Sequence, residues 1–187
     1  MKIIKENKEK INIINKSKFI GKIIKVNSLE DIKENLSNIK KEYPDATHIC
    51  YAYIFENNEK CNDDKEPSGT AGKPMLDIIK RNNLNYILAV VIRYFGGIKL
   101  GSNGLIHAYS NIIKELLLDN TKEIQYGYLI EIIDDYNHSD NINYLLKDSI
   151  IIQKEYHEKI KIKAIVKKET LDNLSNVSYN IIHKTIL

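Results

Sequence analysis

Apolar residues recur along the first two-thirds of the chain with two different periods, and each change of period marks a predicted element. The segments 11–14 and 19–26 are rich in Ile and Val and predict the two strands of a hairpin. After Ser28, apolar residues recur every three or four positions up to Pro44, which predicts a capped helix. Alternation returns at 47–55, where one face of a predicted strand carries Ile, Tyr and Phe and the other carries His, Cys and Ala.

A polar loop separates this strand from a second group of elements. Residues 56–74 form that loop, which is longer than most connections in compact domains. A helix is expected at 75–81, and the continuous apolar run at 86–92 predicts a central strand buried on both faces. A glycine-rich loop then leads into an amphipathic helix at about 103–118.

The last third has a regular pattern that follows a polar stretch at 119–125, which we interpret as a linker. Its order of elements, βαββαβ, is typical of a ferredoxin-like domain. We therefore predict an α+β protein with two domains, at residues 1–120 and 126–187. The elements expected in the second domain are strand 127–135, helix 140–146, strands 150–157 and 159–166, helix 170–174 and strand 179–186.

Composition is typical of a soluble globular protein, because 43% of the 187 residues are hydrophobic and 28% are charged. The net charge is only +3, so overall charge gives no argument for binding to nucleic acid. Cys50 and Cys61 form neither a CxxC pair nor a disulfide framework, which favours a reducing compartment. The N-terminus lacks an apolar signal-peptide core, and no stretch approaches the ~18 apolar residues of a membrane span. We expect a cytoplasmic protein with no membrane partner.

Four glycines fall between residues 96 and 104, where the predicted central strand leads into a helix. Backbone N–H groups, the helix dipole and two cationic side chains would meet there, an arrangement that binds anions such as phosphate. Alternatively, the glycines only permit positive φ and close packing, and Ser102 or Asn103 caps the helix. The spacing fits neither GxGxxG nor GxxxxGK(S/T). The candidate phosphate-binding residues are Arg93, Gly96, Gly97, Lys99, Gly101 and Gly104.

The loop before Pro74 is the second candidate site, and it also ends at a helix N-terminus. Its candidate phosphate-binding residues are Ser68, Gly69, Thr70, Gly72 and Lys73. Asp63, Asp64 and Glu66 precede them and are candidate ligands for Mg²⁺, the single candidate cofactor; with His48 they are also the candidate catalytic groups. The alternative is a solvated acidic loop with local turns, beside a structural histidine bonded to a neighbouring loop.

Four stretches of the chain resemble one known family, the IMPACT/YigZ family. They are "SKFIGKI" (17–23), "YPDATHICYAY" (43–53), "DDKEPSGTAGKPML" (63–76) and "VVIRYFGGIKLGSNGLIHAYS" (90–110), in that order. The resemblance to the family's N-terminal domain spans about residues 11–118. The sequence departs from the family's motifs in three places. Lys65 replaces a glycine of the acidic motif. In the helix motif, Ser102-Asn103 replaces Thr-Gly and His107 replaces an arginine.

The resemblance implies a fold for each domain and a role in translation. The N-terminal domain would share the β-α architecture of a small-subunit ribosomal protein and of domain IV of elongation factor G. The C-terminal domain would resemble another domain of that factor and the second domain of bacterial family members. Eukaryotic relatives act in translational control, which implies RNA, the ribosome or a protein as partner.

These observations support three hypotheses. The first is a translation-associated regulator that binds RNA or ribosome phosphates through the glycine-rich loops. The second is a Mg²⁺-dependent phosphotransferase or phosphoester hydrolase acting on a small phosphorylated or nucleotide substrate, although no unambiguous general base is placed. The third is a protein-interaction module in which both loops serve packing and the C-terminal domain contacts a protein partner.

Overall fold

The computed structural model describes residues 1–186, the last of them by its backbone only. The chain divides into two compact units, Met1–Glu123 and Ile124–Leu187. Each unit has its own apolar core, built from sheets and helices together, as the α+β prediction required.

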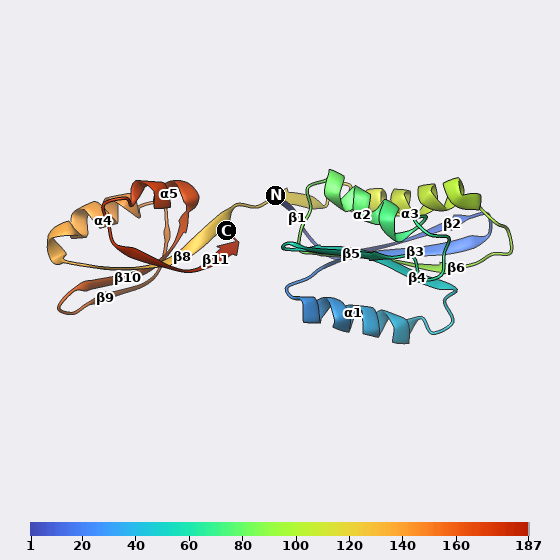
Figure 1. Cartoon of the computed structure of the whole chain (residues 1–187), viewed down its shortest axis with the longest axis horizontal. Coiled ribbons are helices and arrows are strands. Elements are labelled where there is room, and N and C mark those ends of the chain that lie inside the picture. Colours follow the sequence, from blue (N-terminus) through green and yellow to red (C-terminus); the bar gives the residue numbers. More distant parts are fainter. Residues whose placement is uncertain (187) are drawn as a thin grey trace. The chain divides into compact units, whose positions relative to one another are not determined.

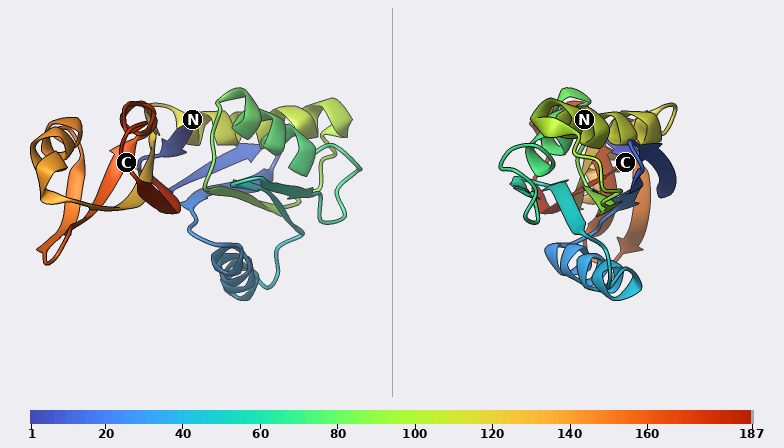
Figure 2. Two further views of the ribbon diagram at one scale, coloured as in Figure 1. Left: turned by 60° about the vertical axis from the view of Figure 1, so that its left-hand side comes forward. Right: turned by 90° about the vertical axis from the view of Figure 1, so that its right-hand side faces the viewer.

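The N-terminal unit is a five-stranded antiparallel sheet with helices on both faces (Figure 1). Helices α2 and α3 cover one face and α1 covers the other, which the rotated views also show (Figure 2). The strand order is β2-β3-β6-β4-β5. The bounds are β2 Lys8–Ile14, β3 Ser17–Lys25, α1 Leu29–Glu42, β4 His48–Phe55, β5 Asn58–Asn62, α2 Gly72–Arg81, β6 Ile87–Tyr94 and α3 Gly101–Leu117.

Strand β6 is the central strand, as its continuous apolar sequence predicts. Ala89 and Val91 belong to the core under α2 and α3, whereas Leu88 and Val90 belong to the core under α1. Because side chains alternate across a strand, both faces of β6 must be apolar when both are covered by helices. The side chain of Ser28 caps α1 by accepting a hydrogen bond from the Asp31 amide at 3.0 Å, which confirms the predicted cap.

Three local predictions were wrong. The segment 56–74 is not one loop, because β5 forms within it and pairs with β4. The last helix of this unit begins at Gly101 rather than near 103. The segment 119–125 contains the strand β7 (Thr121–Glu123), which pairs with β1 (Lys2–Ile4) at the start of the chain.

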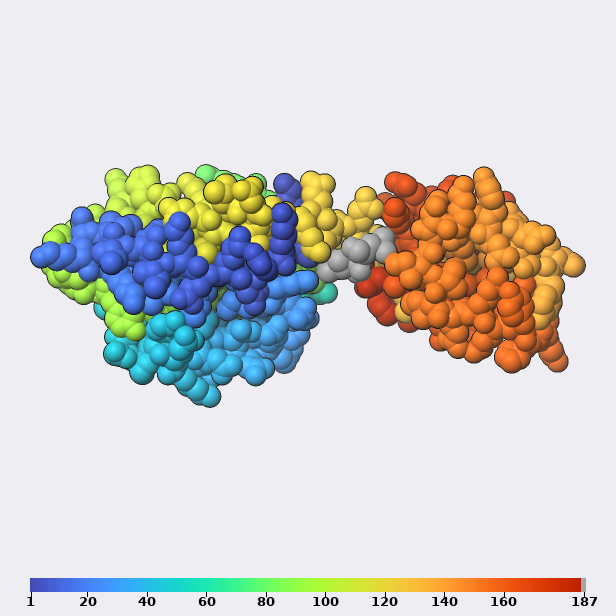
Figure 3. All heavy atoms as spheres, turned by 180° about the vertical axis from the view of Figure 1, so that it is seen from behind, coloured from blue at the N-terminus to red at the C-terminus, as the bar shows by residue number. Residues whose placement is uncertain are grey.

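Edge strand β2 lies beside α3, and in Figure 3 blue atoms from the start of the chain lie alongside yellow ones. Lys10 forms an ion pair with Glu115 of α3 at 3.0 Å, and the Asn12 amide donates to the same carboxylate at 3.0 Å. These polar contacts occupy one side of an otherwise exposed edge strand.

The C-terminal unit is a four-stranded antiparallel sheet with helices α4 and α5 on one face (Figure 1). The strand order is β11-β8-β10-β9. Alternate residues of β10, including Ile160 and Ile162, pack beneath the helices and form its core. The bounds are β8 Tyr126–Asp134, a short 3₁₀ turn Tyr136–His138, α4 Ser139–Leu145, β9 Ile150–Tyr156, β10 Ile160–Lys167, α5 Lys168–Asn173 and β11 Tyr179–Ile186.

Candidate functional site

The two predicted loops meet at one cleft of about 390 Å³ in the N-terminal unit. The first loop contributes residues 65–67 and the second contributes Phe95 and residues 99–102. His48 at the start of β4 and Arg93 near the end of β6 complete it, because those strands are neighbours and the two residues are paired in register. The lining residues are His48, Lys65, Glu66, Pro67, Arg93, Phe95, Lys99, Leu100, Gly101, Ser102 and Leu105.

Asp63 fixes the shape of the first loop. Its Oδ2 accepts a hydrogen bond from the Gly69 amide at 2.8 Å, and its Oδ1 accepts from the amides of Ala71 at 3.1 Å and Gly72 at 2.7 Å. The carboxylate therefore satisfies the first amides of α2, whose N-cap residue, Ala71, has no side-chain acceptor.

Asp64 attaches the same loop to β4. Its Oδ2 accepts a hydrogen bond from the Ile49 amide at 2.6 Å, and its carbonyl oxygen lies 2.8 Å from His48 Nδ1. A carbonyl can only accept, so Nδ1 carries the proton and Nε2 of the neutral ring has a free lone pair. The next residue, Lys65, has φ +69°, a left-handed conformation that favours glycine. This backbone angle would account for the glycine that the resemblance implies at this position.

Glu66 and Arg93 form the floor of the cleft as a buried ion pair. The Arg93 Nη1 donates to Glu66 Oε1 at 2.6 Å, with side chains that are 5% and 3% exposed, respectively. Tyr109 donates its hydroxyl to the same oxygen at 2.8 Å, and His48 Nε2 lies 3.9 Å away. The charge of Arg93 is thus neutralised by a carboxylate, and Arg93 is not the free phosphate-binding cation that its place beside the glycine-rich loop predicts.

Other contacts hold the guanidinium of Arg93 in place. Its Nη2 donates to Ser17 Oγ at 3.3 Å, and its carbon Cζ lies 5.3 Å and 5.5 Å from the ring centres of Phe19 and Phe95. Nε of Arg93 is buried without a hydrogen-bond partner in the described part of the chain.

Burial keeps the groups beneath this floor in their protonated forms. Desolvation raises the pKa of the Cys50 thiol to about 12, and it raises the pKa of the Tyr109 hydroxyl well above its usual value. Cys50 donates to the Asp63 carbonyl oxygen at 3.0 Å. A thiol held protonated is a poor nucleophile, so Cys50 is a packing residue that also supports the loop.

The glycine-rich loop serves two structural needs. The Gly96 amide donates to Ser17 Oγ at 3.2 Å, and a Cβ at Gly96 would overlap the backbone of Lys16 in the β2–β3 turn. Gly101 has φ +71° with open space around it, so glycine is needed there for the backbone angle rather than for packing. These two roles, close packing at Gly96 and a positive φ at Gly101, are the ones that the structural alternative in the sequence predicts. Among the glycines of this loop, Gly101 alone lines the cleft.

The N-terminus of α3 opens onto the cleft without an acceptor of its own. Leu100 is the N-cap residue, no side chain caps the helix, and the first turn carries no acidic residue. Capping by Ser102 or Asn103, the alternative from the sequence, is therefore wrong. Exposed Lys65 and Lys99 also line the cleft, and neither has an ion-pair partner among residues 1–186. Unsatisfied amides and two lysines together favour an anion at this point.

Several predicted residues lie elsewhere. Lys73 pairs with Asp77 at 3.0 Å and, with Gly69, lines a separate hollow between α2 and α3. Thr70 donates its hydroxyl to the Pro67 carbonyl oxygen at 2.6 Å, and a Cβ at Gly72 would overlap the backbone of Asn62 in β5. Ser68, Gly97 and Gly104 do not line the cleft either.

The three acids do not form a metal site. Asp63, Asp64 and Glu66 are each bonded to a different part of the protein, as described above. Within the described residues, no three His, Cys, Asp or Glu side chains come together in an arrangement that could hold a metal ion. The donor set therefore does not fit Mg²⁺, which prefers carboxylates left free to share it with water and phosphate.

Sequence reasoning missed Ser17 and Tyr109 as parts of the site, and it favoured a core position for Phe95, which is exposed. Ser17 and Tyr109 both lie inside the quoted family stretches, so the signal was present. Tyr109 was assigned to the apolar stripe of its helix, because periodicity does not show that a phenol at such a position has a buried carboxylate to bond.

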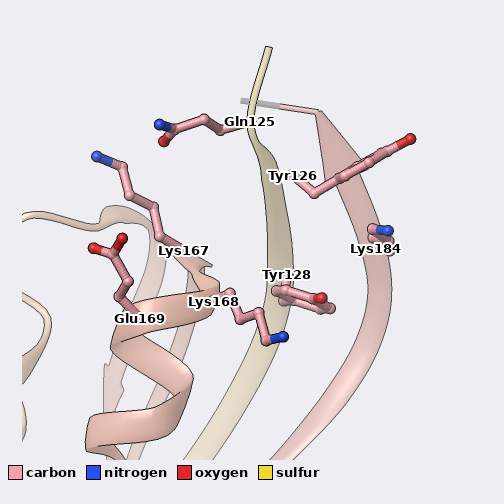
Figure 4. Close-up of a pocket in the computed structure, with 7 residues that line it drawn as sticks. All are labelled: Gln125, Tyr126, Tyr128, Lys167, Lys168, Glu169 and Lys184. Carbon is pink, nitrogen blue, oxygen red and sulfur yellow. The ribbon is translucent and has the colours of Figure 1, made fainter. Parts of the chain in front are cut away.

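A second hollow, of about 400 Å³, lies within the C-terminal unit (Figure 4). The Lys184 Nζ lies 3.5 Å from the ring centre of Tyr126 across strands β11 and β8. Three of its lining residues are lysines and one, Glu169, is acidic, so the hollow carries a positive charge. The lining residues are Gln125, Tyr126, Tyr128, Lys167, Lys168, Glu169 and Lys184.

Comparison with known proteins identifies the family. The Impact N-terminal domain family matches residues 15–117, a segment that contains both loops of the cleft. The chain belongs to the IMPACT family. It is 40% identical over 174 residues to IMPACT family member YvyE of Bacillus subtilis, an alignment that covers 89% of this chain and 80% of that protein.

Other IMPACT proteins match over a shorter part of the chain. IMPACT family member YigZ of Escherichia coli is 37% identical over 115 residues, which is 59% of this chain and 56% of that protein. A crystal structure described as that of a hypothetical protein matches both units, with 28% identity, a TM-score of 0.64 and coverage of 97% of each chain. None of the helices among the described residues is long and apolar enough to span a membrane.

Proposed function

We propose that this IMPACT protein is a cytoplasmic, translation-associated regulator that binds phosphates of RNA or the ribosome in the cleft of its N-terminal unit. The observation that carries the proposal is the convergence of both glycine-rich loops on one cleft with two exposed lysines and the uncapped N-terminus of α3. Such a helix terminus provides amide donors aimed at an anion without any side-chain rearrangement.

Membership of the IMPACT family supports the field of action, because translational control is what the resemblance implies for eukaryotic relatives. We further propose that the N-terminal unit has the β-α fold of the ribosomal protein and elongation factor domain. The C-terminal unit would be ferredoxin-like, which its βαββαβ order and antiparallel β11-β8-β10-β9 sheet support. Its lysine-rich hollow would provide a further contact surface for a partner.

The phosphate contacts are revised from the sequence-based set. We assign them to Lys65, Lys99 and the first amides of α3, including those of Gly101 and Ser102. Arg93 becomes a positioning residue that holds Glu66 at the floor. No observation in the site favours the alternative phosphotransferase or hydrolase activity, since the candidate catalytic acids are all bonded to the protein.

Gel-shift titrations with ribosomal RNA fragments and small ribosomal subunits, at two salt concentrations, test the proposal. Binding should fall steeply with salt, because lysine–phosphate contacts release counterions. Lys99→Glu should weaken binding about tenfold at low salt and reduce the salt dependence. Lys65→Gly removes the second cation while relieving its left-handed backbone, so it should weaken binding without loss of stability.

Lys33→Glu is the matched control. Lys33 is exposed on α1, which covers the opposite face of the sheet, so the substitution makes the same change of net charge away from the cleft. The proposal is wrong if RNA and subunits fail to bind at low salt, or if the Lys33 and Lys99 variants lose binding equally.

A further inference from the structure

We propose that the cleft selects a guanine base, which stacks on Phe95 and donates hydrogen bonds from its Watson–Crick edge to Glu66 and His48. This inference rests on the proposed function, since the phosphate beside that base is the group assigned to Lys65, Lys99 and α3. It names the nucleotide that the phosphate site would accept.

Beside the guanidinium of Arg93, which is engaged by Glu66 and Ser17, the floor of the cleft presents hydrogen-bond acceptors. Oε1 of Glu66 takes the contacts from Arg93 and Tyr109, while Oε2 has no hydrogen-bond partner among the described residues. Glu66 lines the cleft, so Oε2 is the oxygen of this carboxylate that is left for a ligand there. A carboxylate on a side chain only 3% exposed needs a donor from a ligand or water there.

His48 provides the second acceptor. Its Nδ1 donates to the Asp64 carbonyl oxygen, so when the ring is neutral its lone pair lies on Nε2. Nε2 lies 3.9 Å from Oε1 of the Glu66 carboxylate, so the His48 ring and the carboxylate are neighbours in the lining of the cleft.

An inorganic anion alone fits this arrangement poorly. Its oxygens would find amides and lysines at the mouth but would face a carboxylate oxygen at the floor. A ligand that satisfies the whole cleft therefore carries a negative group at one end and adjacent N–H donors at the other.

Guanine meets that requirement better than the other bases. Its N1–H and N2 amino groups are adjacent donors on one edge. Adenine and cytosine place a ring acceptor beside their amino group, and uracil places a carbonyl on each side of its N–H, so each would put an acceptor against Glu66 or His48.

Phe95 provides the stacking surface. It lines the cleft, and its side chain is exposed, at 45%. Arg93 Cζ lies 5.5 Å from its ring centre, which supports the ring from the protein side and fixes its plane. Exposed aromatic rings beside lysines are typical of sites that bind single-stranded RNA.

The test compares short uridine oligomers that carry one central guanosine, inosine or adenosine, titrated against the full chain by fluorescence anisotropy. Inosine keeps N1–H and O6 but lacks the N2 amino group, so length, charge and stacking are nearly constant. The guanosine oligomer should bind about tenfold more tightly than the inosine or adenosine oligomer. Equal affinity for the three overturns the guanine inference and leaves the proposed function standing. Failure of all three to bind overturns both.

A variant that does not disturb the buried floor completes the test. Phe95→Leu keeps an apolar side chain at an exposed position and removes the aromatic face, so it should weaken the guanosine oligomer about five- to tenfold. Tyr136→Leu is the matched control, at an aromatic residue that is 46% exposed in the C-terminal unit. An unchanged affinity of the Phe95 variant, or an equal loss in the Tyr136 variant, would contradict stacking in the cleft.

Discussion

At the scale of single residues, the Glu66–Arg93 pair organises the N-terminal unit. Both side chains are almost fully buried, and the pair joins the loop after β5 to the central strand β6. Removing two charges from water is costly, and the cost is offset here by a 2.6 Å contact and by the Tyr109 and Ser17 hydroxyls. Loss of either charge would leave the other buried without a counterion.

We predict that Glu66→Gln lowers the free energy of unfolding by about 3–5 kcal/mol, because it leaves the guanidinium of Arg93 buried and unpaired. Urea denaturation followed by circular dichroism measures the loss. Asp77→Asn, which breaks the exposed Lys73–Asp77 pair on α2, should change stability by less than about 1 kcal/mol. Similar small losses in both variants would mean that the buried pair is not a structural tie.

At the scale of elements, the loop between β6 and α3 is fixed by its contact with the turn between β2 and β3. Gly96 lies directly against the backbone of Lys16, and its amide bonds the Ser17 hydroxyl that also holds Arg93. The turn residues Asn15 and Lys16 have φ +45° and +64°, which allows the hairpin to close tightly. One serine thus connects the hairpin, the floor of the cleft and the glycine-rich loop.

Gly96→Ala should destabilise the protein by about 3 kcal/mol or more, because the new methyl group overlaps backbone atoms that cannot move aside. The methyl group of Gly97→Ala would meet open space, so only the φ of +84° opposes it. This substitution should lower the free energy of unfolding by about 1 kcal/mol. Thermal denaturation of the two variants makes the comparison. A Gly97 variant as unstable as the Gly96 variant would refute the packing role of Gly96.

At the scale of the whole molecule, each of the two units has apolar cores of its own. The N-terminal unit contains one core on each face of its sheet, and the C-terminal unit has a separate one beneath α4 and α5. The pairing of β1 with β7 joins the two ends of the N-terminal unit. Next to it, Asn120, which is 1% exposed, accepts a hydrogen bond from the Glu6 amide and donates one to the Glu6 carbonyl oxygen. Damage to one core should therefore remain within its unit.

Ile162→Ala should lower the stability of the C-terminal unit by about 2–5 kcal/mol, since Ile162 is fully buried in its core. Hydrogen exchange measured by mass spectrometry on the full chain should show faster exchange in β8 to β11 and unchanged protection in β6 and α3. Faster exchange that extends equally into β6 would show that the two units unfold together.

The sequence by itself determined the elements whose apolar pattern does not depend on which distant segment packs against them. The period of the apolar residues identified α1, α3 and the alternating strand β4. The uninterrupted apolar run identified β6, and that run is apolar on both sides because helices cover both faces of the sheet there. The family stretches identified the two loops that line the cleft. Amphipathic period depends only on neighbours in the chain, so it can be read without knowing the fold.

Only the tertiary structure decided the rest, because the deciding partners are distant in sequence. Strand β7 forms because β1, from the other end of the unit, pairs with it. Edge strand β5 is polar except for Cys61, and it forms because β4 pairs with it. Glu66 neutralises the charge of Arg93, Asp63 caps α2, and Lys73 pairs with Asp77. A charged side chain in the sequence is only a candidate ligand, and it binds a ligand only if folding leaves its charge unpaired, as it does for Lys65 and Lys99.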